Sequence, residues 1–198
     1  MLSKAELTAK FIIETVAPIF NRKGYAATSM ADIEKATGLT KGAIYGNFEN
    51  KEAIAIAAFD KNVNDLLSRI AIYQKESNSP LQKLFLITEF YRNYTEHSQK
   101  MGGCPILNIG VDANNQNTKL LERVQFVINK TQNNIVKLVD WAKTEDELST
   151  DLDTKKFAKY FYTTIQGAVF MSHTMNDRTY LVEAANQIDA LINSNLKK

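Results

Sequence analysis

The scarcity of glycine and proline is the feature that most restricts how this chain can fold. Its 198 residues include only 8 glycines and 3 prolines. A β-sandwich or barrel needs a turn after every short strand, and turns draw heavily on these two residues. Apolar residues recur instead at three-to-four spacing, which is the pattern of an amphipathic helix. The first such run contains Phe11, Ile12, Val16, Ile19 and Phe20. The sequence therefore predicts an all-α fold.

Composition excludes several other classes of protein. With 44% hydrophobic and 23% charged residues, the chain is neither collagen-like nor disordered. Its single cysteine, Cys104, cannot form an internal disulfide, and with two histidines it cannot complete a four-ligand zinc site. We therefore expect no metal and no cofactor. No charged-then-apolar leader opens the chain, and no apolar run approaches the roughly 20 residues of a membrane span. The prediction is a cytoplasmic protein with no membrane partner.

Cap and breaker residues divide the chain into a series of helices. We expect a first helix over about residues 4–22, with a kink or a tightened last turn at Pro18. Two short helices separated by Thr37 and Gly38 should follow, and then a long helix that begins near Asn50. In order, the helices expected after the first cover about residues 29–36, 40–47, 50–74, 81–98, 105–111, 119–143, 153–175 and 179–196.

The basic excess of the chain lies near its start. Residues 1–51 carry seven Lys or Arg against five Asp or Glu, whereas the remainder carries 17 of each. Positive charge concentrated at one end is expected where that end meets a polyanion such as DNA. A solvated surface explains so small an excess about equally well.

The two short helices and the helix before them have the organisation of a helix-turn-helix. Its internal contacts would be Ile33, Ile44 and Phe48. Lys41, Gly42 and Tyr45 would then lie on the outer face of the second short helix. In a major groove, lysine reaches phosphates or guanine, glycine permits close approach, and tyrosine offers a hydroxyl and a flat apolar surface. The alternative is an ordinary pair of core helices on which Lys41 and Tyr45 are merely solvated.

The same stretch resembles a known family, the TetR (tetracycline-repressor) family of bacterial transcription regulators. The resemblance is to that family's N-terminal domain, and it is carried by residues 24–33 (GYAATSMADI), 37–48 (TGLTKGAIYGNF) and 51–52 (KE). It covers about residues 5–55. What it implies is an N-terminal three-helix helix-turn-helix DNA-binding domain over residues 1–50, followed by a larger helical ligand-binding and dimerisation domain over residues 51–198.

The resemblance also implies roles for individual residues. The threonine and lysine at positions matching Thr28 and Lys51 usually touch phosphates, which position a protein without reading sequence. Two residues depart from the family pattern: Glu34 replaces a small residue, and Asn47 replaces a frequent histidine. An asparagine there can bond a phosphate or an adenine. The residues expected nearest the DNA are Thr28, Ser29, Thr40, Lys41, Gly42, Tyr45, Asn47 and Lys51.

The rest of the chain resembles the family's variable regulatory domain in length and helix pattern. This likeness implies a small-molecule pocket between about residues 55 and 143 and a homodimer interface on the last two long helices. Aromatic and polar residues that together suit a pocket are Phe85, Phe90, Tyr91, Tyr94, Met101, Cys104, Asn108 and Phe126. Interface candidates, grouped where Gly167 and Ala168 would allow a partner helix close, are Phe161, Ile165, Gly167, Ala168, Val169 and Met171. Each of these residues suits a monomer's own core as well.

We therefore expect a transcription regulator that binds a palindromic double-stranded DNA operator as a homodimer and is released by a small-molecule effector. Repression is the family's usual behaviour. An alternative makes Cys104 a redox or electrophile sensor, because the N-terminus of a helix opened by Pro105 favours thiolate. The apolar residues around Cys104 favour burial instead. A small helical enzyme is a further class, but the chain has no Gly-rich phosphate loop, metal-ligand set or nucleophile elbow.

Overall fold

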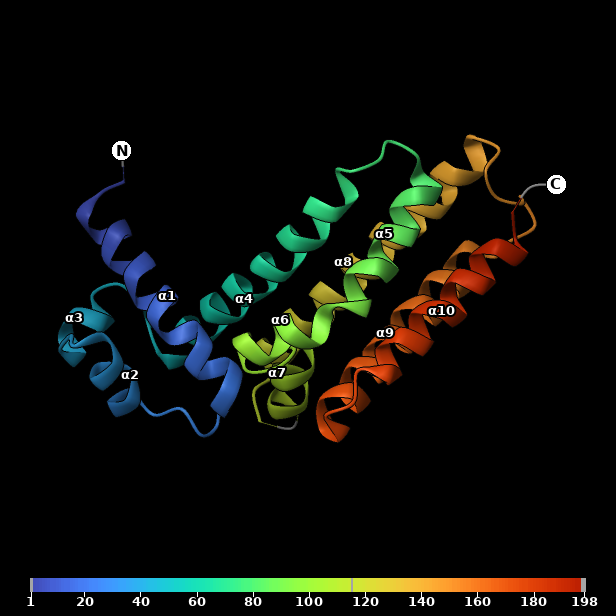
Figure 1. Cartoon of the computed structure of the whole chain (residues 1–198). Helices are drawn as coiled ribbons and strands as arrows, with labels where there is room; N and C mark the ends of the chain where they lie inside the picture. The colour runs from blue at the N-terminus through green and yellow to red at the C-terminus, as the bar shows by residue number, and fades with distance from the viewer. Residues whose placement is uncertain (1, 115, 197–198) are drawn as a thin grey trace. The chain divides into compact units, whose positions relative to one another are not determined.

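The computed structural model of the chain describes residues 2–114 and 116–196, and all the regular elements of that part are helices (Figure 1). The expected all-α fold is confirmed. In chain order the helices are α1 (Lys4–Lys23), α2 (Met30–Thr37), α3 (Lys41–Tyr45), α4 (Lys51–Gln74), α5 (Pro80–Arg92), α6 (Tyr94–Met101), α7 (Pro105–Ala113), α8 (Thr118–Thr144), α9 (Thr154–Met175) and α10 (Thr179–Ser194).

One helix expected from the sequence is divided in two. The segment expected as one helix over residues 81–98 is divided at Asn93, which ends α5 with φ −103° and ψ 6°. Its backbone N–H bonds the Phe90 carbonyl at 3.2 Å, so the last turn of α5 tightens before α6 begins. α1 continues through Pro18. Because Pro18 is exposed, water reaches the side of the helix where the Glu14 carbonyl lacks its usual N–H donor.

The helices form two compact units, each built from segments far apart in the sequence. The first unit comprises Met1–Leu66 and Met101–Phe126, and the second comprises Leu67–Lys100 and Val127–Lys198. The division passes through α4 and α8 and separates the last residue of α6 from the rest of that helix. It therefore describes packing and differs from the functional division at residue 50 expected from the sequence.

The core of the first unit collects the apolar faces of its helices. α4 is tied to α1 where the amide of the buried Asn62 donates to the Ala17 carbonyl at 2.9 Å. Burying one large apolar side chain stabilises a fold by about 1.5–3 kcal/mol. In α1, α2, α3 and α4, the side chains that are at most 1% exposed include Ile12, Val16, Phe20, Ile33, Ile44, Ile54 and Phe59. α1 therefore packs against α2 and is tied to α4, while α3 packs against α2.

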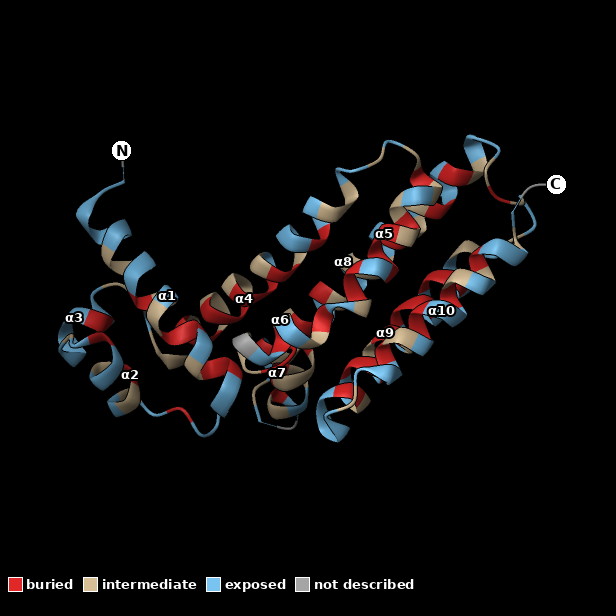
Figure 2. Ribbon diagram, in the orientation of Figure 1, coloured by how far each residue is buried: buried red, intermediate tan, exposed pale blue. Residues whose placement is uncertain are grey.

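In the second unit, α10 packs against both α9 and α5. Buried residues follow one side of these long helices and exposed residues the other (Figure 2). The contact includes a polar link, because Asp189 of α10 accepts from the Arg92 guanidinium and, at 2.6 Å, from the Thr88 hydroxyl. Burial acts to lower the pKa of Arg92, but the hydrogen bonds that its guanidinium donates to Asp189 and Glu89, together with the charges of these carboxylates, outweigh burial and raise it.

Candidate nucleic-acid interface

Local hydrogen bonds fix the turn between the two short helices. At the start of α2, the Ser29 hydroxyl accepts from the Asp32 N–H at 3.1 Å and the Asp32 carboxylate accepts from the Ser29 N–H at 2.9 Å. The helix ends at Gly38, whose φ of 69° lies in the left-handed region that favours glycine. Beside it, the Thr37 hydroxyl accepts from the Leu39 N–H at 3.3 Å. These bonds direct the chain sharply into α3.

α3 has one buried face and one exposed face. Ile44 is fully buried, whereas Lys41, Gly42 and Tyr45 are exposed. The Thr40 hydroxyl caps the helix by accepting from the backbone N–H three residues later, at 3.3 Å. Lys41 Nζ lies 5.9 Å from the centre of the Tyr45 ring, as four-residue spacing on one helix face allows. The outward face thus carries a cation, an aromatic ring with a hydroxyl, and a backbone position without a side chain.

The two departures from the family pattern have structural roles. Asn47 is half-buried, and its amide donates to the Ala43 carbonyl at 2.9 Å, which closes the end of α3. The carbonyl of Glu34 accepts from the Gly38 N–H at 2.8 Å, and its side chain is half-buried. α2 and α3 are in contact, so the side chain of Glu34, which is larger than the family's usual residue, does not prevent these helices from packing.

Thr28 differs from its expected exposure to a phosphate. It is fully buried, and its hydroxyl donates to the Gly24 carbonyl at 2.6 Å. The neighbouring Ser29 is exposed at the start of α2, where a helix dipole favours an anion. In this structure the anion is Asp32, whose pKa is lowered by the Ser29 hydroxyl and then by the Lys23 ammonium 2.9 Å away. The buried Thr28, through its hydrogen bond to the Gly24 carbonyl, supports the loop between α1 and α2 from inside the protein.

Lys51, the first residue of α4, lies beside the same loop. Its Nζ is 4.3 Å from the centre of the Tyr25 ring, a cation–π distance. Partial burial lowers the pKa of Lys51, while the charges of Asp112 and Asp32 act to raise it. Asp112 also accepts from the backbone N–H groups of Tyr25, at 2.5 Å, and Ala26, at 3.3 Å. Lys51, which is expected to bind a phosphate, thus lies against the Tyr25 ring, and Asp112 holds the backbone of Tyr25.

α7 also contacts the end of α1, and no sequence pattern pointed to this contact. The amide of the buried Asn21 donates to the carbonyls of Met101, at 2.7 Å, and Gly103, at 3.0 Å. In return, the Asn108 amide donates to the carbonyls of Asn21 and Gly102, each at 2.9 Å. Asn108 was a candidate for a ligand pocket, but in the structure its amide donates hydrogen bonds to carbonyls of α1 and of the α6–α7 turn.

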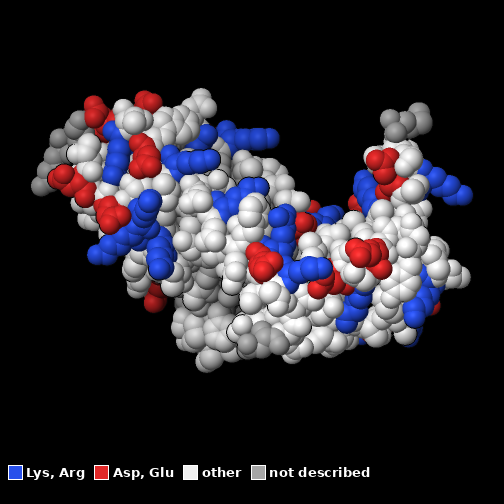
Figure 3. Space-filling view, turned by 180° about the vertical axis from the view of Figure 1, so that it is seen from behind, with Lys and Arg blue, Asp and Glu red and all other residues white. Residues whose placement is uncertain are grey.

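Basic and acidic side chains are intermixed over the face drawn in Figure 3. No block of one sign dominates that face, which agrees with the small net charge of +2. Long-range attraction of a polyanion to this face is therefore expected to be weak.

The candidate pocket residues divide between the two compact units. Phe85, Phe90, Tyr91 and Tyr94 belong to the second unit, and Met101, Cys104, Asn108 and Phe126 to the first. Phe90 is fully buried, and its ring centre lies 5.2 Å from that of Tyr91 and 5.7 Å from that of Tyr94. Phe126 differs from its expected place, because it is 53% exposed on α8 beneath the Arg123 guanidinium. The second unit therefore holds the aromatic cluster of this set.

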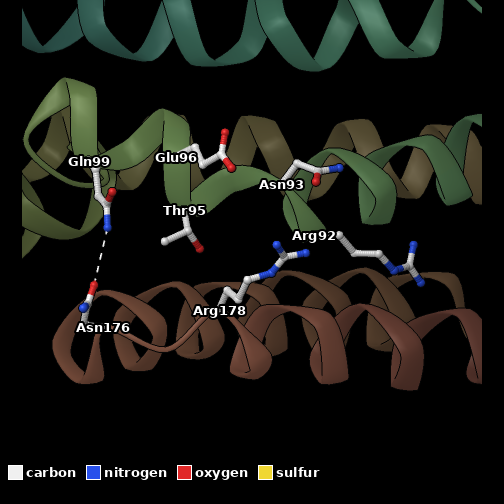
Figure 4. Close-up of a pocket in the computed structure, with 7 residues that line it drawn as sticks. All are labelled: Arg92, Asn93, Thr95, Glu96, Gln99, Asn176 and Arg178. Atoms are coloured by element: carbon white, nitrogen blue, oxygen red, sulfur yellow. Dashed lines mark hydrogen bonds between the residues drawn. The ribbon is translucent and has the colours of Figure 1, made fainter.

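The second unit has a polar hollow that sequence reasoning missed (Figure 4). Its volume is about 220 Å³. Arg178 extends into it from the start of α10, and the Gln99 amide closes one end by donating to Asn176 at 3.5 Å. Polar residues on a helix are typical of a solvated face, so nothing in the sequence distinguishes the residues that line this hollow. The lining residues are Arg92, Asn93, Thr95, Glu96, Gln99, Asn176 and Arg178.

The structure places most of the expected dimer-interface residues inside the protomer. Phe161, Ile165, Ala168 and Val169 are buried and Met171 is half-buried, so only Gly167 of that set is exposed. The outer face of α9 instead carries Tyr160 and Phe170, which are 48% and 54% exposed. A Cβ added at Gly167 would meet no atom within 4 Å. This exposed stripe, made of Tyr160, Thr163, Gly167 and Phe170, is called the α9 stripe below.

Cys104 precedes α7 and is only 4% exposed. A sensor thiol must meet its oxidant at the surface, and buried thiols are inert. The burial therefore favours a packing role over redox sensing.

Among the described residues, no group of three or more His, Cys, Asp and Glu side chains is arranged to hold a metal ion, and no helix has the length and apolarity to span a membrane.

Two family models match the chain. Residues 12–58 match the model described as bacterial regulatory proteins, tetR family, and residues 80–188 match the one described as tetracyclin repressor-like, C-terminal domain. The first match contains α2, α3 and the start of α4. The second spans α5 to the middle of α10 and covers more than half of the chain.

Similar proteins are named as regulators as well. A transcriptional regulator of the TetR family from Cytophaga hutchinsonii has a crystal structure with a TM-score of 0.92 and 34% identity, covering 100% of this chain and 99% of that one. The fatty acid metabolism regulator protein of Bacillus subtilis is 24% identical over 93% of each chain. YuxN, an uncharacterised HTH-type regulator of the same species, is 34% identical over 44% of this chain, and the matched part spans 31% of YuxN.

Proposed function

The chain belongs to the tetR family of bacterial regulatory proteins, and from that membership we propose that it is a repressor that binds a palindromic operator as a homodimer and leaves it when a small molecule binds. Its family identifies it as a DNA-binding transcription regulator with a helical regulatory domain. The observation that carries the proposal is the outward face of α3, where Lys41, Gly42 and Tyr45 stand together opposite the buried Ile44. The cytoplasm, where the operator lies, is the proposed location.

Within this proposal, the residues at the DNA have different tasks. Lys41 and Tyr45 read base edges in the major groove, and Gly42 lets the backbone come close. Lys51 and the start of α2 at Ser29 bind phosphates, which set the register. Thr40 and Asn47 keep α3 in shape through their hydrogen bonds, at 3.3 and 2.9 Å. Buried Thr28 supports the loop before α2.

The proposed homodimer uses the α9 stripe. Two exposed aromatic residues, Tyr160 and Phe170, flank a glycine that lets a second helix approach closely. A two-fold axis through this stripe makes the interface self-complementary. It also pairs two copies of α3, which reads a palindrome when the copies lie about 34 Å apart.

The proposed effector is a small amphipathic molecule. The second unit holds both an aromatic cluster around Phe90 and a polar hollow that includes Arg178. An apolar body with a few polar groups is the usual composition of a small-molecule site. The name of the Bacillus subtilis relative, a fatty acid metabolism regulator, agrees with an effector of this chemistry. To empty the operator, the effector must favour the non-binding state by about 5 kcal/mol.

Binding to duplexes that span the DNA beside the protein's own gene tests the proposal, because regulators of this kind often act there. Fluorescence anisotropy should give a dissociation constant of about 10⁻⁸ M or lower for one duplex, and binding at least about 10³-fold weaker to random sequence. Dodecanoate, kept below its micelle-forming concentration, should release the specific duplex, whereas acetate, which lacks the chain, should not.

Each part of this experiment has its own contrary result. Equal affinity for the flanking and the random duplexes would remove operator recognition. Release by acetate as well as by dodecanoate would point to a general effect of added anions. Retention of the duplex at saturating dodecanoate would remove this class of effector and leave DNA binding in place.

A further inference from the structure

α7 holds the loop that precedes the DNA-facing helices. One oxygen of Asp112, Oδ2, accepts from both the Tyr25 N–H at 2.5 Å and the Ala26 N–H at 3.3 Å. A Cβ at Gly24 would lie 2.8 Å from the Asp112 carboxyl carbon, so the loop lies as close to α7 as glycine permits. Gly24 has φ +81°, a conformation that other residues rarely adopt. The approach of this loop to α7 is therefore specifically built.

This loop adjoins the groups that reach DNA phosphates in the proposed function. The Tyr25 ring supports the Lys51 ammonium at 4.3 Å. At the other end of the loop, the buried Thr28 hydroxyl donates to the Gly24 carbonyl at 2.6 Å, directly before Ser29 opens α2. A change in the backbone at Tyr25 therefore moves both Lys51 and the start of α2.

A second contact fixes α7 itself against α1. The Asn108 amide donates to the Asn21 carbonyl at 2.9 Å, and the Asn21 amide donates to the Gly103 carbonyl at 3.0 Å. The buried Oδ1 of Asn21 has no hydrogen-bond partner among the described residues. A buried acceptor without a donor lowers the stability of the fold. Asn21 nevertheless occupies this position and forms both hydrogen bonds with the α7 segment. Asp112, one turn after Asn108 on α7, is thus presented to the loop from a fixed helix.

We propose that Asp112 is a positioning residue for DNA binding, which holds the α1–α2 loop so that Lys51 and the start of α2 meet the phosphates together. This inference rests on the proposed function. The charge of Asp112 and its hydrogen bonds act in opposite directions. Removing a carboxylate near Lys51 reduces repulsion from DNA and strengthens binding, whereas losing both hydrogen bonds releases the loop and weakens it.

Three variants separate these effects. Asp112→Ala removes the charge and the acceptor, whereas Asp112→Asn removes the charge and keeps an oxygen that accepts from the loop. Asp60→Ala is the matched control for charge: Asp60 lies on α4 and accepts from Arg123, a residue of α8, at 2.7 Å. We expect Asp112→Ala to bind the operator about tenfold more weakly. Asp112→Asn and Asp60→Ala should bind as tightly as the wild type or more tightly.

Two further readouts distinguish positioning from partial unfolding. Log affinity against log salt concentration should have a slope smaller by about one in Asp112→Ala, since a phosphate contact is lost. A partly unfolded sample would keep the slope. In the DNA-free protein, the amides of Tyr25 and Ala26 should exchange hydrogen faster in Asp112→Ala and at the wild-type rate in Asp112→Asn.

The outcomes identify which proposal fails. If Asp112→Ala binds as tightly as Asp112→Asn with an unchanged slope, or if its loop amides exchange at the wild-type rate, Asp112 has no positioning role and DNA binding stands. If the wild type prefers no duplex over random sequence, the proposed function fails, and the positioning role fails with it. A weaker Asp112→Ala with a smaller slope and faster exchange supports the role.

Discussion

Gly167→Glu is expected to leave the protein monomeric and to weaken operator binding by roughly 100-fold or more, because two linked half-site contacts exceed one alone by about 10²–10⁴. Gly167 lies between the two ends of α9 and is exposed, and there is open space where a Cβ would be. The protomer therefore accepts the new side chain without strain, and glutamate is the better helix former. Across a two-fold axis, however, the two glutamates bring like charges into one buried interface.

The measurement is sedimentation at micromolar concentration together with an operator titration. Ala71→Glu is the matched control, since Ala71 is an exposed helical residue of the same unit and the added charge is identical. It should stay dimeric and bind normally. A Gly167→Glu protein that sediments as the wild-type dimer and binds DNA as tightly would place the interface elsewhere.

Tyr45→Ala is expected to lose about 1–3 kcal/mol of affinity for the operator while changing little on random DNA, because base-edge contacts carry the discrimination. Tyr45 is 39% exposed and packs outward on α3, so its removal leaves the helix-turn-helix core intact. Lys51→Ala, by contrast, should weaken binding to every duplex about equally and reduce the salt slope by about one. Tyr45→Phe shows how much of the loss belongs to the hydroxyl.

Anisotropy titrations of each variant on the operator and on a scrambled duplex provide the comparison. Circular dichroism should give the same helical content and unfolding temperature for all three proteins. An equal loss on both duplexes for Tyr45→Ala would mean that the tyrosine contacts the backbone of DNA and reads no base.

Much of the helix-turn-helix could be predicted from the sequence because its determinants are local. Ser29 and Asp32 form a cap three residues apart, and Gly38 supplies the left-handed residue that ends α2. The exposure of Lys41 and Tyr45 follows from their four-residue spacing once Ile44 is assigned to the core. Each of these inferences needs only the residue types and the spacing within one short helix and its caps.

What escaped prediction depends on contacts between distant segments. Thr28 and Ser29 are neighbours of similar chemistry, but the tertiary packing buries only Thr28. Asp112 reaches a backbone 87 residues away, and no local pattern marks such a carboxylate as a cap. α9 carries aromatic residues on both of its faces, so periodicity alone could not decide whether Phe161 or Tyr160 lies inward. The packing of α9 against α10 decides it.

The most direct test of operator recognition through α3 is selection of genomic DNA fragments by the purified protein, followed by sequencing. The enriched fragments should share one inverted repeat whose half-sites are centred about one helical turn, or a multiple of it, apart. Tyr45→Ala protein in the same selection should lose this enrichment. Fragments with no common sequence, or the same repeat recovered equally well by the Tyr45→Ala protein, would contradict operator recognition through α3.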